Sequence, residues 1–194
     1  MDAEFYNKIY STRPLRWDDK ERDVFVGDSL SEPSSLLDIG CGTGHTIRHL
    51  SSVWPETEFY GVDLSSVAIQ LANDRKIPNA KFYVGDVMDM DIEIPAVNTV
   101  LLMGVAEHFR NQQDIARIRK FIKPSGFLYL EIPNCLSCDD SKEEGFRKTS
   151  GGSGQDEWHL RRETWEDIIK VAGYKIAKSL IGHRSSWEFI WVLQ

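Results

Sequence analysis

The 194-residue sequence contains only three cysteines, an odd number that does not make a disulfide framework. Cys135 and Cys138 form one C-x-x-C pair, and no second pair follows to complete a zinc site. We therefore expect two free thiols at this pair, with a metal or redox role as the alternative. A chain with so few cysteines is typical of a reducing compartment, and the expected location is cytoplasmic.

Long hydrophobic runs and an excess of positive charge are also missing. No stretch approaches the ~18 apolar residues that span a bilayer, and the N-terminus, MDAEFYNKIY, contains acids but no apolar signal core. The formal net charge is −7, which argues against a protein that binds nucleic acid through a basic face. We expect neither a membrane nor a nucleic acid as partner.

The chain does contain enough apolar residues, 41%, for one domain of 194 residues with a substantial core. Apolar runs typical of strands alternate with segments of helical periodicity, which indicates an α/β protein with a parallel sheet. The runs that predict strands are 36–39, 58–63, 81–84, 98–103, 127–133, 174–181 and 187–193.

The most informative stretch is LLDIGCGTGHT, residues 36–46. Asp38 lies near the end of its apolar run, and Gly40, Gly42 and Gly44 follow before a helical pattern begins. Glycines at every second position let the backbone approach a ligand and present N–H groups at a helix start. The spacing differs from the G-x-G-x-x-G of dinucleotide-binding proteins, and Asp38 would repel a pyrophosphate but attract a cation. A glycine-rich turn without a ligand is the alternative.

Two further acids follow strand-like runs. Asp63 lies about 20 residues beyond the glycine turn, where an acid can accept hydrogen bonds from both hydroxyls of a ribose. Asp86 follows the run 81–84 in a Gly-Asp sequence that is also common in plain turns. These positions predict a ligand at the carboxyl edge of the sheet, and acids that only form turns or lie on the surface are the alternative.

These motifs together resemble the class I S-adenosylmethionine-dependent methyltransferases, whose first motif is hD-x-G-x-G-x-G, and in particular their small-molecule members. The resemblance covers about residues 34–194. It implies a Rossmann-like three-layer α/β/α sandwich with a seven-stranded, mostly parallel sheet, in the order 3-2-1-4-5-7-6, that ends in an antiparallel hairpin.

The resemblance also implies S-adenosyl-L-methionine as the cofactor. In that family the acid at the position of Asp63 binds the ribose, and the residues at the positions of Asp86 and Val87 contact the adenine. The cofactor-binding residues expected in full are Asp38, Gly40, Cys41, Gly42, Gly44, Asp63, Leu64, Asp86, Val87 and Met103.

Candidate catalytic residues follow the run 98–103. Glu107 and His108 match the h-h-E-H sequence of many small-molecule methyltransferases, and His159 is the third candidate. A histidine that only packs at a helix start is the alternative for His108. Relatives that bind a divalent metal have E-x-x-E-H, in which both acids and the histidine are ligands. Because Gly104 replaces the first acid, we expect no metal.

The N-terminal segment 1–30 has a helical pattern and predicts a lead-in of two helices that cover one side of the sheet. A second hypothesis is that its aromatic and basic residues close the cofactor site. Those residues are Tyr6, Tyr10, Arg13 and Trp17.

Two segments of the C-terminal half add further expectations. Residues 135–160 are rich in charge, glycine and serine, which predicts a lid loop beside the acceptor pocket, with a plain disordered loop as the alternative. Ile115, Ile118, Phe121 and Ile122 predict a helix that ends before Pro124, and Thr164 is the expected capping residue of the last helix.

The sequence therefore predicts an S-adenosylmethionine-dependent methyltransferase (EC 2.1.1) that acts on a small molecule. The N-P-P-aromatic sequence that receives a flipped adenine is absent. A non-catalytic, methyltransferase-like binding module is the first alternative, and a nucleotide-dependent oxidoreductase is the second.

Overall fold

The computed structural model describes residues 2–15, 19–88, 93–133, 145–148, 156–181 and 188–193. Within these residues the chain divides into two compact units. We call Asp2–Leu101 with Phe121–Gly126 the N-terminal unit, and Leu102–Lys120 with Phe127–Gln194 the C-terminal unit.

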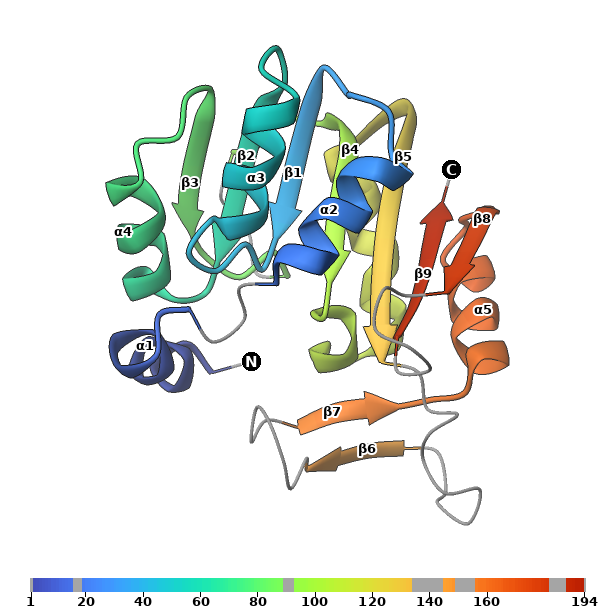
Figure 1. The fold of residues 1–194 in the computed structure, drawn as a ribbon. Helices are drawn as coiled ribbons and strands as arrows, with labels where there is room; N and C mark the ends of the chain where they lie inside the picture. The colour runs from blue at the N-terminus through green and yellow to red at the C-terminus, as the bar shows by residue number, and fades with distance from the viewer. Residues whose placement is uncertain are drawn as a thin grey trace. The chain divides into compact units, whose positions relative to one another are not determined.

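Five strands form a parallel sheet of the Rossmann-like α/β type (Figure 1). They are β1 (Ser35–Ile39), β2 (Glu58–Asp63), β3 (Ala80–Val84), β4 (Val97–Met103) and β5 (Ile122–Pro133). Within the N-terminal unit, β2 pairs in parallel with both β1 and β3, so that Ile39 lies opposite Val62 and Asp63 lies opposite Val84. The loops that follow these three strands therefore meet at one edge of the sheet.

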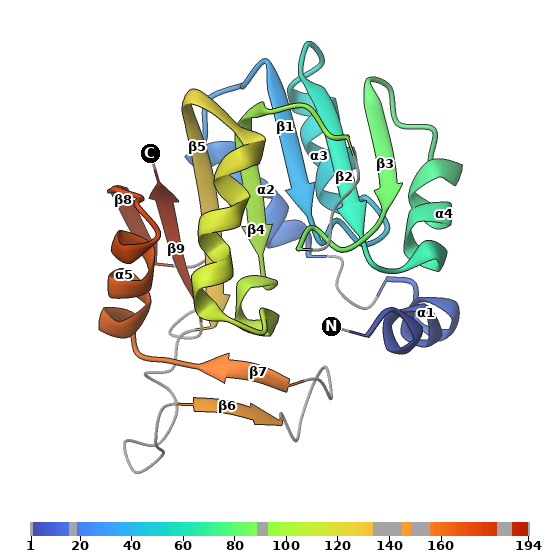
Figure 2. The ribbon, with the colours of Figure 1, turned by 180° about the vertical axis from the view of Figure 1, so that it is seen from behind.

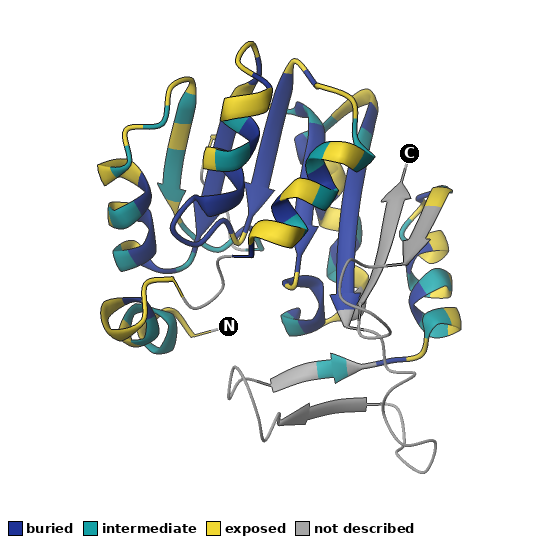
Figure 3. Ribbon diagram, in the orientation of Figure 1, coloured by how far each residue is buried: buried dark blue, intermediate teal, exposed yellow. Residues whose placement is uncertain are grey.

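The central strands are buried along their length. All five residues of β1 are buried, including Leu36 and Leu37, whereas β3 carries exposed and half-buried side chains (Figure 3). A strand covered on both faces needs a continuous apolar run, which is the pattern seen around Asp38. The fold thus places the acid of the glycine motif inside the core.

Four helices complete the N-terminal unit: α1 (Ala3–Thr12), α2 (Lys20–Ser29), α3 (His45–Val53) and α4 (Ser66–Asp74). Two of these helices, α1 and α2, lie in the predicted lead-in and begin after the capping residues Asp2 and Asp19. α1 packs against α4, α2 packs against α3, and α4 lies beside β3 (Figure 2). Both lead-in helices therefore contact a helix that follows one of the first two strands.

Within the described residues, the C-terminal unit contains three antiparallel strand pairings and one α-helix. Its elements after β4 are η1 (Ala106–His108), η2 (Gln112–Phe121, which reaches into the N-terminal unit), β6 (Gly145–Lys148), β7 (Asp156–His159), α5 (Arg162–Val171), β8 (Ile176–Ile181) and β9 (Glu188–Leu193). β6 pairs antiparallel with β7, and β9 pairs antiparallel with both β5 and β8.

The helix expected around Ile115 is a 3₁₀-helix, η2, rather than an α-helix. Ile122, expected in the same helix, is instead the first residue of β5. The three apolar residues that remain in η2, Ile115, Ile118 and Phe121, are spaced by three and all are buried. Side chains three residues apart align in a 3₁₀-helix, which has three residues per turn. The three-residue spacing therefore suits the tighter helix.

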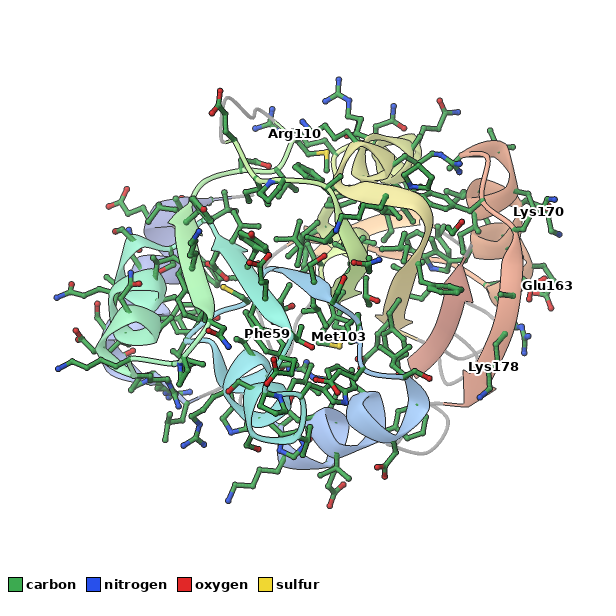
Figure 4. The ribbon with its side chains drawn as sticks, turned by 90° about the horizontal axis from the view of Figure 1, so that it is seen from above. Phe59, Met103, Arg110, Glu163, Lys170 and Lys178 are labelled. Atoms are coloured by element: carbon green, nitrogen blue, oxygen red, sulfur yellow. The ribbon has the colours of Figure 1, made fainter. Side chains whose placement is uncertain are left out.

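Helix α5 has one buried and one exposed face. Trp165 and Ile169 are buried, whereas Glu163 and Lys170 point outward (Figure 4).

The capping expectation for Thr164 is wrong, because α5 begins two residues before Thr164, at Arg162. The residue at its N-cap position, Arg161, makes no side-chain capping hydrogen bond.

The predicted lid segment 135–160 contains the strand pair β6 and β7. Residues 135–144 and 149–155 of this segment, which include Cys135 and Cys138, lie outside the described residues. In the described parts of the chain, no helix is long and apolar enough to cross a membrane.

Candidate functional site

The glycine motif forms a tight turn between β1 and α3. Gly40, Gly42 and Gly44 all have positive φ, at 75°, 53° and 72°, a region that side chains with a Cβ rarely adopt. The backbone N–H groups of Gly40 and Cys41 donate to the carbonyl oxygen of Val62 at 2.8 and 3.1 Å. The turn is thereby attached to the end of β2, and Gly44 becomes the N-cap of α3.

Asp63, the last residue of β2, joins three loops. Its Oδ2 accepts from the N–H of Gly42 at 2.9 Å, and its Oδ1 accepts from the N–H of Ser65 at 2.8 Å. Its backbone carbonyl accepts from the N–H of Gly85 at 2.9 Å. One residue therefore connects the loops that follow β1, β2 and β3.

The Asp63 carboxylate still has capacity for a ligand. A carboxylate offers about four lone-pair sites, and the two backbone donors use two of them. Burial raises the pKa of Asp63, and the hydrogen bonds from Ser65 and Gly42 counteract that rise. The group can therefore accept two further hydrogen bonds, which is what a ribose diol offers.

Asp38 is a second buried acid of the same unit. Burial raises the pKa of its carboxyl from 3.8 to about 7; the charge of Arg22 opposes this rise, and the charges of Asp23 and Asp63 add to it. The residue is only 3% exposed. An ionised carboxylate held at such a cost favours a cationic ligand.

The loop after β3 has the geometry of an Asx turn. The Oδ1 of Asp86 accepts from the N–H of Met88 at 2.8 Å, and the side chain of Val87 is buried. Leu64, between Asp63 and Ser65, is half-buried. Seven of the expected cofactor-binding positions are thus brought to one edge of the sheet through the contacts of Asp63. They are Gly40, Cys41, Gly42, Gly44, Asp63, Leu64 and Asp86.

Cys41 is buried in the glycine turn and its thiol contacts the carbonyl oxygen of Gly42 at 3.7 Å. Burial, together with the charges of Asp63 and Asp38, raises the pKa of this thiol well above its usual range. A thiol held protonated is a poor nucleophile. Cys41 can therefore line the site but is not suited to covalent chemistry.

Three contacts around the glycine turn had no signal in the sequence. Arg75, after α4, donates from Nη2 to the Oγ1 of Thr43 at 2.9 Å. The buried carboxylate of Asp23 in α2 bonds with Nδ1 of His45 and accepts from Oγ1 of Thr46 at 2.7 Å. The partners are 22 to 32 residues apart in the sequence, so neither periodicity nor a local motif connects them.

The hypothesis that aromatic residues of the N-terminal segment approach the cofactor site gains one contact. A Cβ on Gly42 would lie only 2.6 Å from the hydroxyl oxygen of Tyr10, which is buried at the end of α1. Trp17, named in the same hypothesis, lies outside the described residues.

The C-terminal unit holds the candidate catalytic residues. Met103 ends β4 and is buried, Gly104 follows with φ 65°, and η1 begins at once. Glu107 is buried, its Oε1 lies 3.7 Å from where a Cβ on Gly104 would be, and His108 is half-buried. A side chain at position 104 would therefore lie next to the Glu107 carboxylate.

Strand β7 packs against η1. The indole Nε1 of Trp158 donates to the carbonyl oxygen of Phe109 at 2.8 Å. This contact brings the end of the predicted lid segment to the residue that follows His108. The side chain of His159, the third catalytic candidate, lies outside what the structure describes.

Among the described residues, no group of three or more His, Cys, Asp or Glu side chains is arranged to hold a metal ion.

Comparison with known protein families places these motifs in one of them. Residues 36–126 match the methyltransferase domain family. The chain is 32% identical over 117 residues to a malonyl-[acyl-carrier protein] O-methyltransferase of Halalkalibacterium halodurans, covering 57% of this chain and 41% of that protein. It is 27% identical over 135 residues to the dTDP-4-amino-2,3,4,6-tetradeoxy-D-glucose N,N-dimethyltransferase of Saccharopolyspora spinosa, covering 66% and 53%. The chain thus spans about half or less of the length of these relatives.

Solved structures agree on the fold. The 1,6-didemethyltoxoflavin-N1-methyltransferase of Burkholderia thailandensis, with S-adenosylhomocysteine bound, superposes with a TM-score of 0.75 at 14% identity, covering 98% of this chain and 84% of that chain. A methyltransferase from Aquifex aeolicus gives 0.69 at 14% identity, covering 100% and 98%. The glycine turn after β1, this fold and the sequence matches all agree with the class I S-adenosylmethionine-dependent methyltransferases, the class that the motifs predicted.

Proposed function

We propose that this protein transfers the methyl group of S-adenosyl-L-methionine to a small-molecule acceptor. The observation that carries the proposal is Asp63, which connects the loops after β1, β2 and β3 and keeps two lone-pair sites for a ribose diol. The relatives named above include methyltransferases of a sugar nucleotide and of a carrier-bound malonyl group, and both names support a small acceptor.

In this proposal the two buried acids bind different parts of the cofactor. Asp63 accepts from the ribose hydroxyls, Asp38 faces the cationic end, and Asp86 with Val87 contacts the adenine. The glycine turn lets the backbone approach the cofactor closely, and Cys41 and Leu64 line the same part of the site. Met103, at the end of β4, completes the cofactor-binding set.

When bound, the cofactor would supply a methyl group on a sulfonium sulfur, from which the neutral thioether is already a good leaving group. The protein then has two tasks, of which the first is alignment of the acceptor, worth ~7–11 kcal/mol in well-oriented systems. The second is removal of a proton where the acceptor carries one, and we assign this to His108. Glu107 and His159 complete the proposed acceptor side, and no metal takes part.

The finer architecture is part of the same proposal. We propose a single methyltransferase domain over residues 1–194, with the strand order 3-2-1-4-5-7-6 in which β8 and β9 are the sixth and seventh strands. The antiparallel pairing of β9 with β5 and with β8 supports this order. The family match over 36–126 includes residues of both units, which supports one domain. The lid expected over 135–160 stays a prediction.

Calorimetric titration with S-adenosylhomocysteine tests the proposal. Each hydrogen bond to a charged group contributes ~1.5–3 kcal/mol, so Asp63→Ala, which removes two, weakens binding on the order of a hundredfold or more. Asp74→Ala, at an exposed acid of α4, is the matched control and binds like the wild type. Thermal melting establishes that each variant is folded.

The alternatives give different results in the same assays. A dissociation constant that is unchanged in Asp63→Ala would contradict the ribose assignment. A thermal shift with NAD in place of S-adenosylhomocysteine would favour the oxidoreductase. Tight cofactor binding without methyl transfer across a broad panel of amines, hydroxyl compounds and carboxylates would favour the non-catalytic binding module.

A further inference from the structure

The side chain of Asn7 in helix α1 forms hydrogen bonds with the start of α4. The Oδ1 of Asn7 lies within hydrogen-bond distance of three donors: the hydroxyls of Ser65 and Ser66 at 2.7 and 3.4 Å, and the N–H of Val67 at 3.3 Å. All three belong to the cap and first turn of α4. Asn7 therefore gives this helix start an acceptor in addition to the Ser65 hydroxyl, which accepts from the N–H of Ala68.

The contact between Asn7 and Ser65 lies next to the proposed ribose site. Ser65, the strongest partner of Asn7, also donates its N–H to the carboxylate of Asp63 at 2.8 Å. Asn7, Ser65 and Asp63 thus form a continuous chain from α1 to the acid that connects the three loops.

A second contact of α1 reaches the glycine turn. Tyr10 follows Asn7 by three residues, so the two side chains lie on the same side of the helix. The Tyr10 hydroxyl covers Gly42 so closely that a Cβ there would lie 2.6 Å away. Helix α1 therefore contacts the loop after β1 through Tyr10 and the loop after β2 through Asn7.

Apolar burial contributes little to holding α1 in place. Within the helix, only Tyr10 is buried, and the other residues are exposed or half-buried. An element with little buried apolar surface opens at low free energy, so individual polar contacts carry a large share of its attachment.

We propose that Asn7 is a positioning residue that holds α1 across the cofactor site, and that the cofactor leaves when the contact of Asn7 with α4 opens. This inference rests on the proposed function. The hydrogen bonds of Asn7 hold α1 closed, Tyr10 then covers the glycine turn, and the rate of cofactor release depends on how often the Asn7 contact breaks.

The test compares Asn7→Leu, which removes the acceptor at similar volume, with Asn7→Asp, which retains it. Stopped-flow displacement measures the release of S-adenosylhomocysteine, and hydrogen exchange of residues 3–12 is measured in the ligand-free protein. In Asn7→Leu we expect release about tenfold faster, which corresponds to about 1.4 kcal/mol, and faster exchange. Asn7→Asp behaves like the wild type. Lys8→Leu, at an exposed position of the same helix, is the matched control.

Two outcomes overturn the inference: release and exchange in Asn7→Leu that equal the wild type, or equal losses in Asn7→Leu and Asn7→Asp. Tyr10→Phe is the second variant, and we expect faster release with unchanged exchange of α1. A wild-type protein that does not bind S-adenosylhomocysteine would refute the proposed function instead. The exchange measurement would still test the Asn7 contact, because it uses the ligand-free protein.

Discussion

Replacing Asp38 by asparagine should make the protein more stable and at the same time weaken cofactor binding. Asp38 is only 3% exposed, and burial is the main reason that the pKa of its carboxyl rises from 3.8 to about 7. At about 1.4 kcal/mol per pH unit, the ionised form therefore costs the folded state about 4 kcal/mol. Asn is close in size and carries no charge, so Asp38→Asn removes this cost.

The pH dependence has a defined sign. Between pH 4 and 7 the unfolded chain has already lost the proton of Asp38, whereas the folded protein retains it, because its pKa is raised to about 7. The contribution of Asp38 to stability therefore falls as pH rises through this window and is lowest above pH 7. The Asn variant lacks this dependence. The two proteins should differ little near pH 4 and most at pH 8.

Thermal melting across pH 4–8 measures this difference. For a chain of this size, about 4 kcal/mol corresponds to a Tm higher by roughly 8–16 °C at pH 8. A variant that melts at or below the wild type at pH 8, or that shows the same difference at pH 5 and pH 8, would refute the reasoning about burial.

Cofactor binding should show the opposite preference. A cationic ligand stabilises the ionised form of Asp38, so the affinity of the wild type for S-adenosylhomocysteine should rise as pH increases toward about 7 and then level off. The Asn variant should bind more weakly and without this pH dependence. Together, the two measurements identify Asp38 as a residue retained for function at the expense of stability.

Three further outcomes are expected. Gly42→Ala should lower stability by about 2 kcal/mol or more, because φ is 53° and the new Cβ would lie 2.6 Å from the Tyr10 hydroxyl. The control is Gly27→Ala in α2, where the nearest side-chain atom is 3.5 Å away and the substitution should raise stability by ~0.5–1 kcal/mol. Equal effects of the two substitutions in thermal melts would contradict the predicted clash. His108→Gln should lower kcat roughly 10²–10⁴-fold with little change in KM if His108 removes the acceptor proton, whereas an unchanged kcat would leave His108 a packing role. Methyl transfer should be unaffected by EDTA, because Gly104 replaces the first acid of the metal-binding pattern, and activity lost on chelation and restored by Mg²⁺ would contradict this.

Much of the N-terminal unit could be predicted from the sequence. The run 58–63 predicted β2 at its observed bounds. This prediction depends on local chemistry, because a continuous apolar run marks a strand covered on both faces. The Rossmann-like α/β fold was confirmed for the same reason, whereas the order of all seven strands stays a prediction.

Local sequence patterns did not predict the correct helix type or helix start where two periodicities or two capping positions were possible. Ile115, Ile118 and Phe121 are compatible with either helix type, and burial of all three in one row favours the 3₁₀ form. Thr164 has the composition of a cap, but α5 begins at Arg162. The strands β6 and β7 were not predicted, because their segment is rich in polar residues and glycine and they pair only with each other.

The sequence by itself determined the β–glycine–α motif, the acids that follow the strands and hence the resemblance to the methyltransferases, because these signals lie within a few residues of one another. Only the tertiary structure decided how these residues act together. The contact of Asp63 with Gly42, that of Asn7 with Ser65 and the raised pKa of Asp38 all join or surround groups that are distant in the chain. Such contacts form when strands and helices pack, and packing removes the water that would otherwise screen the buried charges.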